Sequence, residues 1–355
     1  MPFHDFMERA LYAPGEGYYA RPQTAWSAAA DFVTAPQVDA SFGVAVALLA
    51  QECDAALGGL ESFDLVEMGG GDGALLGDAC DALERRAPQV YERTRVWSIE
   101  RGDASRAQQR DRLAAHAPRV EWIASLDELP PGSLHGLVVS NELLDAFPVH
   151  RVVWRGGLRE LYVDIEGEDF VERELAPSVP ELAGYLAANH ISLQEGQVAE
   201  ICLHVAPWVE SVARSLAQGF VCTADYGAET AALYDAGRMN GSLVCQHRYQ
   251  LTAAAFERIG EQDITAHVDF GNLRRCGATY GLADGGIASL TVFLVGFGAA
   301  DDIAPPDTGS EAGGAEVRRR LGLRHLLFSE IGDAHRVMLQ SKGVAPIPFG
   351  LSRLG

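Results

Sequence analysis

Residues Val66 to Asp78 read V-E-M-G-G-G-D-G-A-L-L-G-D, and the apolar run 63–66 leads directly into them. Three alternating glycines, Gly69, Gly71 and Gly73, separate this run from a helical pattern. That order predicts a tight turn from a strand into a helix, whose bare backbone lets an adenosine-type ligand lie against it. The stretch therefore predicts an α/β fold that binds a nucleotide cofactor.

The spacing of these glycines and one carboxylate distinguishes between cofactors. In the dinucleotide fingerprint the third glycine comes three positions after the second, and a pyrophosphate faces the start of the helix. Here Gly73 comes two positions after Gly71, and Glu67 stands two before Gly69. A carboxylate beside the turn would repel a pyrophosphate but suits the sulfonium and amino groups of S-adenosylmethionine. The pattern favours a methyl donor over NAD, and a glycine-rich turn without a ligand is the alternative.

The next strands of a class I methyltransferase sheet are expected at predictable distances. Residues 95–100 form a second strand that ends in Glu100, the candidate acceptor of hydrogen bonds from both ribose hydroxyls. The alternative for Glu100 is a solvated carboxylate at a strand end. A third strand, 120–123, leads into a loop whose Ser125 and Leu126 are placed to meet the adenine.

Polar residues also follow the predicted fourth strand, 136–140. In an open α/β sheet ligands collect at the carboxyl ends of the strands, so Asn141, Glu142 and Asp145 are the residues to examine there. We expect Asn141 to touch the cofactor or to hold the loop in place.

Five motifs occur in the order seen in the MidA-like methyltransferases, and the sequence resembles that family. They are D-F-V-T-A-P at 31–36, E-M-G-G-G-D-G at 67–73, N-E-L-L-D-A-F-P at 141–148, D-Y-G at 225–227 and D-I-T-A-H-V-D-F at 263–270. The family includes the mitochondrial protein arginine methyltransferase that helps assemble respiratory complex I. The resemblance, from Phe3 to about Lys342, implies S-adenosylmethionine as cofactor and an arginine on a protein as acceptor. It also assigns Thr34 and Pro36 to the cofactor site.

The sequence departs from the family pattern in its first forty residues. Ala30 replaces a glycine, Gln37 replaces a glutamate, and family members carry a longer segment ahead of the stretch 3–7. A trimmed or divergent start is the expectation. The change at Gln37 bears on acceptor specificity more than on the cofactor, because the glycine turn and Glu100 are intact.

An arginine acceptor requires carboxylates, because its guanidinium stays protonated at neutral pH. Carboxylates can hold the group by two-pronged hydrogen bonds and leave one nitrogen facing the methyl group. Glu142 and Asp145, three positions apart, could form such a clamp. Alternatively, Asp145 caps a helix ahead of Pro148.

Three further side chains are candidates on the acceptor side. Tyr226 follows the fifth predicted strand, 220–224, and either lines the acceptor channel or packs by its ring. His247 and His267 are candidates for a general base or for orienting the acceptor, since imidazole titrates near neutrality. His267 is favoured because it lies in a family-like motif. The histidines lack metal-ligand spacing, so no metal is expected.

Composition narrows the class of protein. The net charge of −21 and a pI near 4.8 argue against nucleic acid as a partner. They suit a basic acceptor, or they maintain solubility. The six cysteines are scattered without a C-x-x-C pair, which indicates a reducing compartment. Neither a signal peptide nor a run of about 18 apolar residues is visible, so we expect no membrane span and a cytoplasmic location.

The chain length of 355 residues fits one large domain with insertions. The predicted segments are an N-terminal helical lid and lead-in helix (1–58), the cofactor-binding core (59–227) with a hairpin insertion near 149–165, a helical or mixed acceptor-side lobe (228–298), a flexible linker (299–316) and a C-terminal segment that completes the sheet (317–355). Within the last, 335–340 is predicted to be an antiparallel edge strand.

Together these patterns predict a class I, seven-stranded α/β methyltransferase with N-terminal helices and a helical insertion. The predicted reaction is methyl transfer from S-adenosylmethionine to an arginine of a partner protein, for which a respiratory complex I subunit is one candidate. A small-molecule acceptor is one alternative. The other is a cofactor-binding assembly factor with little turnover.

Overall fold

The computed structural model describes residues 1–21, 35–248, 250–298 and 334–350. The chain divides into two compact units, each of which is treated by itself. Unit 1 comprises Met1–Phe32, Leu143–Glu210 and Tyr226–Cys276, and unit 2 comprises Val33–Glu142, Ser211–Asp225 and Gly277–Gly355. The predicted linker 299–316 lies outside the described residues.

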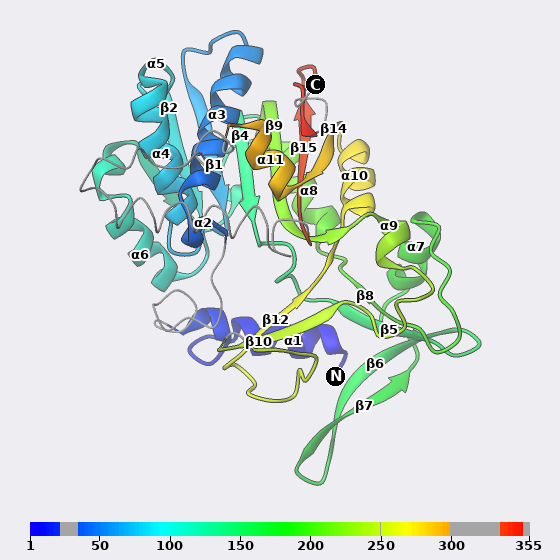
Figure 1. Ribbon diagram of the computed structural model, residues 1–355. Helices are drawn as coiled ribbons and strands as arrows, with labels where there is room; N and C mark the ends of the chain where they lie inside the picture. Colours follow the sequence, from blue (N-terminus) through cyan, green and yellow to red (C-terminus); the bar gives the residue numbers. More distant parts are fainter. Residues whose placement is uncertain (22–34, 249, 299–333, 351–355) are drawn as a thin grey trace, which may run out of the picture. The chain divides into compact units, whose positions relative to one another are not determined.

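Unit 2 is built on a sheet with the strand order β14-β15-β9-β4-β1-β2-β3 (Figure 1). The strands are β1 Phe63–Met68, β2 Thr94–Ile99, β3 Val120–Ile123, β4 Leu134–Asn141, β9 Leu216–Ala228, β14 Ala283–Ser289 and β15 His335–Lys342. From β3 to β9 every neighbouring pair is parallel, whereas β14 and β15 are antiparallel. These seven strands form the predicted class I sheet, and the fold class is confirmed. An eighth short strand, β13 Val268–Asp269, pairs with β9 beside this path.

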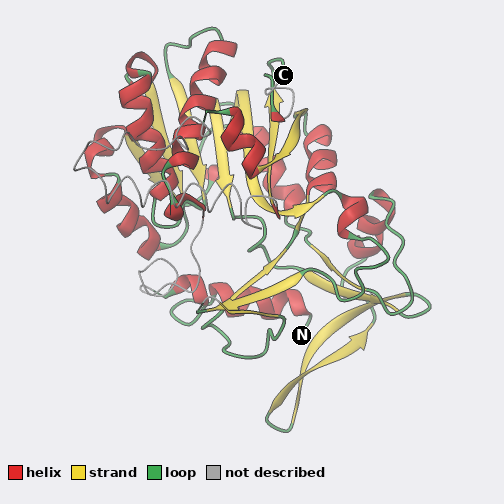
Figure 2. Cartoon of the chain, in the orientation of Figure 1, coloured by secondary structure: helices red, strands yellow, loops and turns green. Residues whose placement is uncertain are grey.

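Helices accompany these strands in unit 2 (Figure 2). They are α2 Ala35–Val38, α3 Ser41–Ala56, α4 Ala74–Arg86, α5 Pro88–Tyr91, α6 Asp103–Arg112 and α11 Leu290–Gly296, with 3-10 turns η2 Ala114–Arg119 and η3 Leu126–Glu128. One apolar core joins α3, α4 and α11 to the sheet. Within it the rings of Phe42 and Phe293 pack edge to face at 5.9 Å.

The central strand β1 buries two carboxylates as well as its apolar side chains. Asp64 is fully buried and accepts hydrogen bonds from the Arg95 guanidinium at 2.9 Å and from the Trp97 indole at 2.9 Å. Charge-assisted bonds of this kind offset the cost of burying a carboxylate. Glu67, at the other end of the strand, keeps one oxygen without a hydrogen-bond partner among the described residues. That difference separates a structural carboxylate from a candidate functional one.

The glycine at position 219 has a different role from the predicted one. Its place after the apolar stretch 205–216 predicts that it ends a helix. Instead α8, Val205–Ser215, gives way to β9 at Leu216, and Gly219 lies within β9 opposite Gly136 of β4. A Cβ on Gly219 would lie 2.1 Å from the Gly136 oxygen, so close backbone approach, and not helix termination, explains this glycine.

Unit 1 contains two smaller antiparallel sheets, with the strand orders β7-β6-β5-β8 and β11-β10-β12. Their strands are β5 His150–Trp154, β6 Leu158–Glu166, β7 Asp169–Leu175, β8 Val198–Ile201, β10 Leu243–His247, β11 Gln250–Thr252 and β12 Asp263–Ala266. The strand β13 also lies in unit 1 but pairs in parallel with β9. The helices are α1 Phe3–Tyr12, η1 Tyr18–Ala20, α7 Glu181–Ala188, α9 Thr230–Leu233 and α10 Phe270–Thr279. Three elements, α8, β9 and α10, cross the division between the units.

The insertion between β4 and α8 is richer in strands than the sequence pattern predicts. β5 and β6 form the predicted hairpin, with Gly156 at φ +59° in its turn. β7 and β8 extend it to a four-stranded sheet, and α7 is the helical part. The sequence of β7, D-F-V-E-R-E-L, is mostly charged and exposed, so it carries little of the apolar alternation by which strands are recognised.

Two terminal elements can also be compared with their predictions. The amphipathic helix α1 is present, and its buried face packs into the apolar core of unit 1, so its predicted function as a lid stays a prediction. β15 is antiparallel to β14 as predicted, but it is not an edge strand, because it lies between β14 and β9. The true edge, β14, reads A-D-G-G-I-A-S, and its two glycines and few apolar residues give no strand signal.

The compact units cut across the predicted segments. Residues from Gly277 onward, which include β14 and α11, belong to unit 2, so the predicted lobe 228–298 is divided between the units. The predicted core 59–227 is likewise divided, because the insertion packs with Leu233 and Tyr234 into a separate core within unit 1. Contacts between distant segments decide these boundaries, and the sequence pattern does not contain them.

Candidate functional site

The glycine turn of unit 2 begins where β1 ends and stops where α4 begins. Gly69, Gly71 and Gly73 have φ values of +70°, +54° and +83°, and Gly73 is the N-cap residue of α4. L side chains rarely adopt this left-handed region, so the backbone path requires the alternating glycines. Asp72 supports the turn, because its Oδ1 accepts a hydrogen bond from Ala74 N at 3.0 Å. The predicted strand, turn and helix are therefore present at the predicted residues.

A buried glutamine that sequence reasoning missed holds this turn. Gln109 in α6 is 1% exposed, and its Nε2 donates a hydrogen bond to the Gly71 carbonyl at 3.0 Å. Its Oε1 accepts a hydrogen bond from the Ser98 hydroxyl of β2 at 2.5 Å. α6 is mostly polar, so no local pattern distinguishes Gln109 from the other polar residues of the helix.

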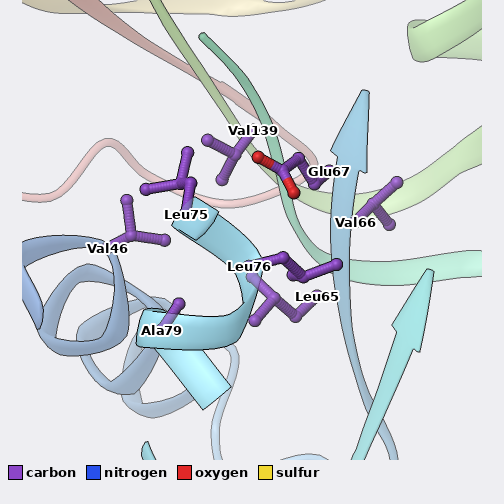
Figure 3. Close-up of a pocket in the computed structure, with 8 residues that line it drawn as sticks. All are labelled: Val46, Leu65, Val66, Glu67, Leu75, Leu76, Ala79 and Val139. Atoms are coloured by element: carbon purple, nitrogen blue, oxygen red, sulfur yellow. The ribbon is translucent and has the colours of Figure 1, made fainter. Parts of the chain in front are cut away.

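Glu67 lies beside the turn with its carboxyl among apolar side chains. Figure 3 shows the group near Leu75 and Val139, with Val46 on the neighbouring helix. The side chain is 4% exposed, and its Oε2 has no hydrogen-bond partner among the described residues. Burial, followed by the nearby charges of Asp72 and Glu100, raises the pKa of Glu67 from 4.5 to about 8.

These features fit a positively charged adenosyl ligand. A cation beside Glu67 would stabilise its ionised form, and the oxygen without a partner is where such a charge would be received. Gly70 preserves the space for this carboxyl, because a Cβ there would lie 2.5 Å from Glu67 Oε2. The turn can therefore hold the methionine end of S-adenosylmethionine.

Glu100 directly follows β2 and is not a freely solvated strand end. Its Oε1 accepts a hydrogen bond from Gly102 N at 2.7 Å, and its backbone N donates to Ile123 O at 2.9 Å. The side chain is half-buried, and burial is the largest cause of its raised pKa. The position and the burial suit an acceptor for ribose hydroxyls, which stays the prediction for Glu100.

The loop after β3 has a clear structural role in addition to its predicted one. Ser125 is the N-cap of η3, and its hydroxyl accepts a hydrogen bond from Asp127 N at 3.1 Å. Glu128 completes a capping box by accepting from Ser125 N at 3.1 Å. Leu126 is buried. Contact of Ser125 and Leu126 with the adenine stays a prediction.

The segment that the resemblance assigns to the cofactor reaches the glycine turn through one side chain. Gln37, in α2, donates through Nε2 to Asp72 Oδ2 at 3.1 Å. The sequence interpretation connected Gln37 with acceptor specificity and missed this contact. Pro36 is buried in the same short helix, and Thr34 lies outside the described residues.

Two polar residues lie at the end of β4 in unit 2: Asn141 is its last residue, and Glu142 follows it. Asn141 carries an Oδ1 that is buried without a hydrogen-bond partner among the described residues. Its Nδ2 lies 3.5 Å from Glu142 Oε1. Glu142 has φ +47°, an uncommon conformation for a residue other than glycine, and its backbone N donates to Ala224 O at 3.0 Å. Backbone strain of this kind concentrates at functional sites.

Asp145 belongs to unit 1 and lies in a turn. Residues 142–149 contain no helix, so the alternative in which Asp145 caps a helix ahead of Pro148 is wrong. The turn is held from two directions. The Asp145 carbonyl accepts a hydrogen bond from Ala266 N at 2.9 Å, and the Ala146 carbonyl accepts one from the Tyr12 hydroxyl at 2.8 Å.

The backbone of unit 1 brings Tyr226 and His267 together with this turn. Gly227 of β9 pairs with Val268 of β13, so Tyr226 and His267 precede paired residues on adjoining strands. His267 also directly follows Ala266, which contacts Asp145. Both side chains are half-buried, and burial, followed by the charge of Arg238, lowers the pKa of His267. The lowered pKa favours the neutral imidazole, which is the form with a free lone pair.

Other polar residues of the family-like motif have structural roles. Asp269 accepts hydrogen bonds from the Tyr185 hydroxyl at 2.8 Å and from Asn272 N at 2.9 Å. Asp263 accepts one from the Tyr19 hydroxyl at 2.8 Å. His247 bonds through Nδ1 to the Glu261 carbonyl at 2.9 Å, at the end of β10. These contacts hold segments of unit 1 together, and His267 is the stronger candidate of the two histidines.

Two general properties concern the described ranges only. No group of three or more histidine, cysteine, aspartate or glutamate side chains there is arranged to hold a metal ion. No helix in the same ranges is both long enough and apolar enough to cross a membrane.

A family model and curated sequences match this chain. The family is described as an "S-adenosyl-L-methionine-dependent methyltransferase" family, and its model matches residues 45–287. The human mitochondrial protein arginine methyltransferase NDUFAF7 is 26% identical in an alignment that covers 81% of this chain and 66% of the relative. The Caenorhabditis elegans homologue is 25% identical over 76% of this chain. The chain thus spans just under two thirds of the length of the human relative.

Solved structures match this chain over a larger share of both chains than the human relative does. A superfamily member from Burkholderia thailandensis, crystallised with S-adenosyl-homocysteine, is 31% identical with a TM-score of 0.86, and the match covers 100% of this chain and 90% of that one. A native structure from the same organism is 30% identical with a TM-score of 0.84. The predicted family resemblance and the predicted S-adenosylmethionine cofactor are confirmed.

One prediction is overturned by these comparisons. The absence of a recognisable signal predicts a cytoplasmic location, but the curated relatives from human, worm and mouse are named as mitochondrial proteins. The cytoplasmic prediction is therefore wrong. It depended on features missing from the sequence, and these carry less information than homology.

Proposed function

Because the chain belongs to this family of S-adenosyl-L-methionine-dependent methyltransferases, we propose that it transfers a methyl group to an arginine of a protein. The observation that carries the donor half is the buried Glu67 carboxyl beside the glycine turn, with one oxygen left without a partner. The acceptor half is supported by the names of the curated relatives and by the net charge of −21, which suits a basic partner.

The residues of unit 2 have distinct roles toward the donor. S-adenosylmethionine supplies an electrophilic methyl group on a sulfonium. Gly69, Gly71 and Gly73 leave the backbone bare for its methionine portion, and Glu67 balances its positive charge. Glu100 accepts hydrogen bonds from the ribose hydroxyls. The roles of Pro36, Ser125, Leu126 and Asn141 at the cofactor follow the same proposal.

The acceptor needs to be held and to lose a proton. A protonated guanidinium binds carboxylates by paired hydrogen bonds, and Glu142 and Asp145 are the carboxylates proposed for this task. His267 is the proposed base, because its lowered pKa favours the neutral imidazole. Tyr226 is proposed to line the path of the acceptor. A subunit of respiratory complex I is the first acceptor to test, since the sequence resembles the assembly methyltransferase.

Label transfer from S-adenosylmethionine tests this proposal. The purified protein is incubated with methyl-tritiated donor and a cell extract, and protein and small-molecule fractions are then counted. Acid hydrolysis of the protein fraction should release labelled methylarginines. Label in the small-molecule fraction alone would replace the protein acceptor by a small one. Donor binding without transfer to either fraction would favour an assembly factor.

A further inference from the structure

Glu67 is a buried acid without a cationic partner. The interactions that shift its pKa are, in order, burial, the charges of Asp72 and Glu100, and a backbone hydrogen bond from Leu76. No lysine, arginine or histidine of the described residues is among them. Asp64 in the same strand is fully buried too, yet it is held by Arg95. The two carboxylates of β1 therefore face opposite electrostatic environments.

The groups packed around Glu67 favour the protonated form of its carboxyl. Val46 of α3, Leu75 of α4 and Val139 of β4 line its surroundings (Figure 3). The titratable groups that face it, Asp72, Glu100 and Cys80, are either acidic or neutral thiol, and the pKa of Cys80 is itself raised to about 12. An ionised Glu67 would be a buried charge with an oxygen that no donor satisfies.

We propose that Glu67 is a proton store matched to the cofactor: it is ionised beside the sulfonium donor and protonated beside the neutral thioether product. In the free protein at pH 7 the carboxyl holds its proton. Donor binding brings a positive charge to the oxygen without a partner, and Glu67 releases that proton to solvent. The buried region then contains a compensated pair of charges.

Methyl transfer reverses the ionisation of Glu67, and the reaction balances with the uptake of one proton. The carbon–sulfur bond breaks with its electron pair left on sulfur, and a carbon–nitrogen bond forms on the acceptor. The guanidinium loses one N–H proton through the proposed base His267 to solvent, so its single positive charge is retained. Glu67 takes up one proton when the sulfur becomes neutral, which avoids an uncompensated buried carboxylate. This return half depends on the arginine acceptor proposed above, whereas the binding half does not.

Counting protons at the binding step tests the proposal without any acceptor. Titration calorimetry at pH 7.0 in two buffers of different ionisation enthalpy gives the protons released per ligand bound. If the sulfonium lowers the Glu67 pKa by about two units, S-adenosylmethionine should release about 0.8 proton. S-adenosylhomocysteine should release close to none, because it carries the same ammonium and carboxylate as the donor but lacks the sulfonium charge. Equal counts for the two ligands would overturn the proposal.

Two variants identify the group that titrates. Glu67→Gln keeps the shape of the side chain and should abolish the difference between the ligands. Asp78→Asn removes a different carboxyl, in α4, whose pKa is also raised by burial, and it should leave the difference intact. If the two ligands still differ in the number of protons released by Glu67→Gln, the proton belongs to another group and the proposal is wrong.

A direct measurement on the unmodified protein covers the case in which Glu67→Gln does not fold. Carbon-13 labelling of glutamate side chains should show one carboxyl that titrates near pH 8. Saturating S-adenosylmethionine should move this titration below pH 7, and S-adenosylhomocysteine should not. A midpoint unmoved by either ligand contradicts the proposal. A failure of arginine methylation would appear only in the label-transfer assay, so the two proposals fail separately.

Discussion

Gln109 in α6 donates a hydrogen bond to the backbone carbonyl of Gly71, 38 residues earlier in the chain, at 3.0 Å. The same side chain accepts a hydrogen bond from Ser98 in β2. One buried amide thus joins the glycine turn to the second strand of the sheet. The geometry of the turn depends on this amide as well as on the glycines.

Replacing this amide should loosen the turn. Gln109→Met keeps the side-chain length but leaves the Gly71 carbonyl and the Ser98 hydroxyl unsatisfied, which costs about 1–3 kcal/mol for each buried group. We expect a lower melting temperature and weaker S-adenosylmethionine binding, measured by calorimetry. Gln108→Met, at the neighbouring position of the same helix, is the control. Equal affinities in the two variants would show that the turn holds its shape without Gln109.

A side chain at Gly71 should block the cofactor. Its φ of +54° is strained for any residue with a Cβ and worse for a β-branched one, and the backbone there has to approach the ligand. Gly71→Val should therefore lose detectable S-adenosylmethionine binding. Gly157→Val, at a turn with nothing within 4 Å of an added Cβ, should bind normally. Full affinity in a folded Gly71→Val protein would remove the turn from the cofactor site.

The ribose prediction concerns Glu100. Loss of a charge-assisted pair of hydrogen bonds costs on the order of 1.5–3 kcal/mol, or about ten- to a hundredfold in affinity. Glu100→Ala should show this loss in a binding titration. Glu121→Ala removes an exposed carboxyl of the adjoining strand β3 and should bind as the unmodified protein does. Unchanged affinity in Glu100→Ala would mean that the Glu100 carboxylate has only a structural role, as acceptor of the hydrogen bond from Gly102 N.

Binding and turnover should separate at the proposed acceptor carboxylates. Glu142→Gln and Asp145→Asn replace charged contacts with neutral amides, so methyl transfer should fall roughly tenfold or more while donor affinity is retained. Donor affinity by calorimetry, melting temperature and label transfer are measured on both variants. Because no helix begins at Asp145, a capping role does not compete with this explanation. Full activity in both variants would exclude the clamp.

The raised pKa of Glu67 has a consequence for stability. Between its ordinary pKa of 4.5 and the native value of about 8, the folded state binds more protons than the unfolded state. The free energy of unfolding therefore falls as pH rises through this window, by on the order of 5 kcal/mol at most. Glu67→Gln lacks this contribution, so denaturant unfolding at pH 5 and pH 8 should show a smaller decline in the variant. Parallel declines would indicate that Glu67 ionises normally when buried.

Parts of the fold could be predicted because their signals are local. β1 to β4 are short apolar runs bounded by turn residues, and their predicted positions agree with the structure to within two residues. β7 and β14 were missed as strands for the opposite reason. Their sequences are charged or glycine-rich, and each forms a strand by pairing with a neighbour, β6 or β15.

The residues of the candidate site also differ in whether a local sequence signal identifies them. Glu67 and the glycines could be identified from spacing within a few residues. Gln109 could not, because its hydrogen bonds reach β2 and the glycine turn from a mostly polar helix. The Asp72 contact of Gln37 was missed for the same reason.

The sequence by itself determined the family, the cofactor and the course of the chain through the turn, since a left-handed backbone at alternating positions requires glycine wherever the chain folds. Tertiary structure alone decided the raised pKa of Glu67, because burial among α3, α4 and β4 is its largest cause. It also decided that Asp145 contacts Ala266, and that Tyr226 and His267 each precede one residue of the Gly227–Val268 pair. These relationships join residues far apart in the chain, and only the pairing of distant strands brings them together.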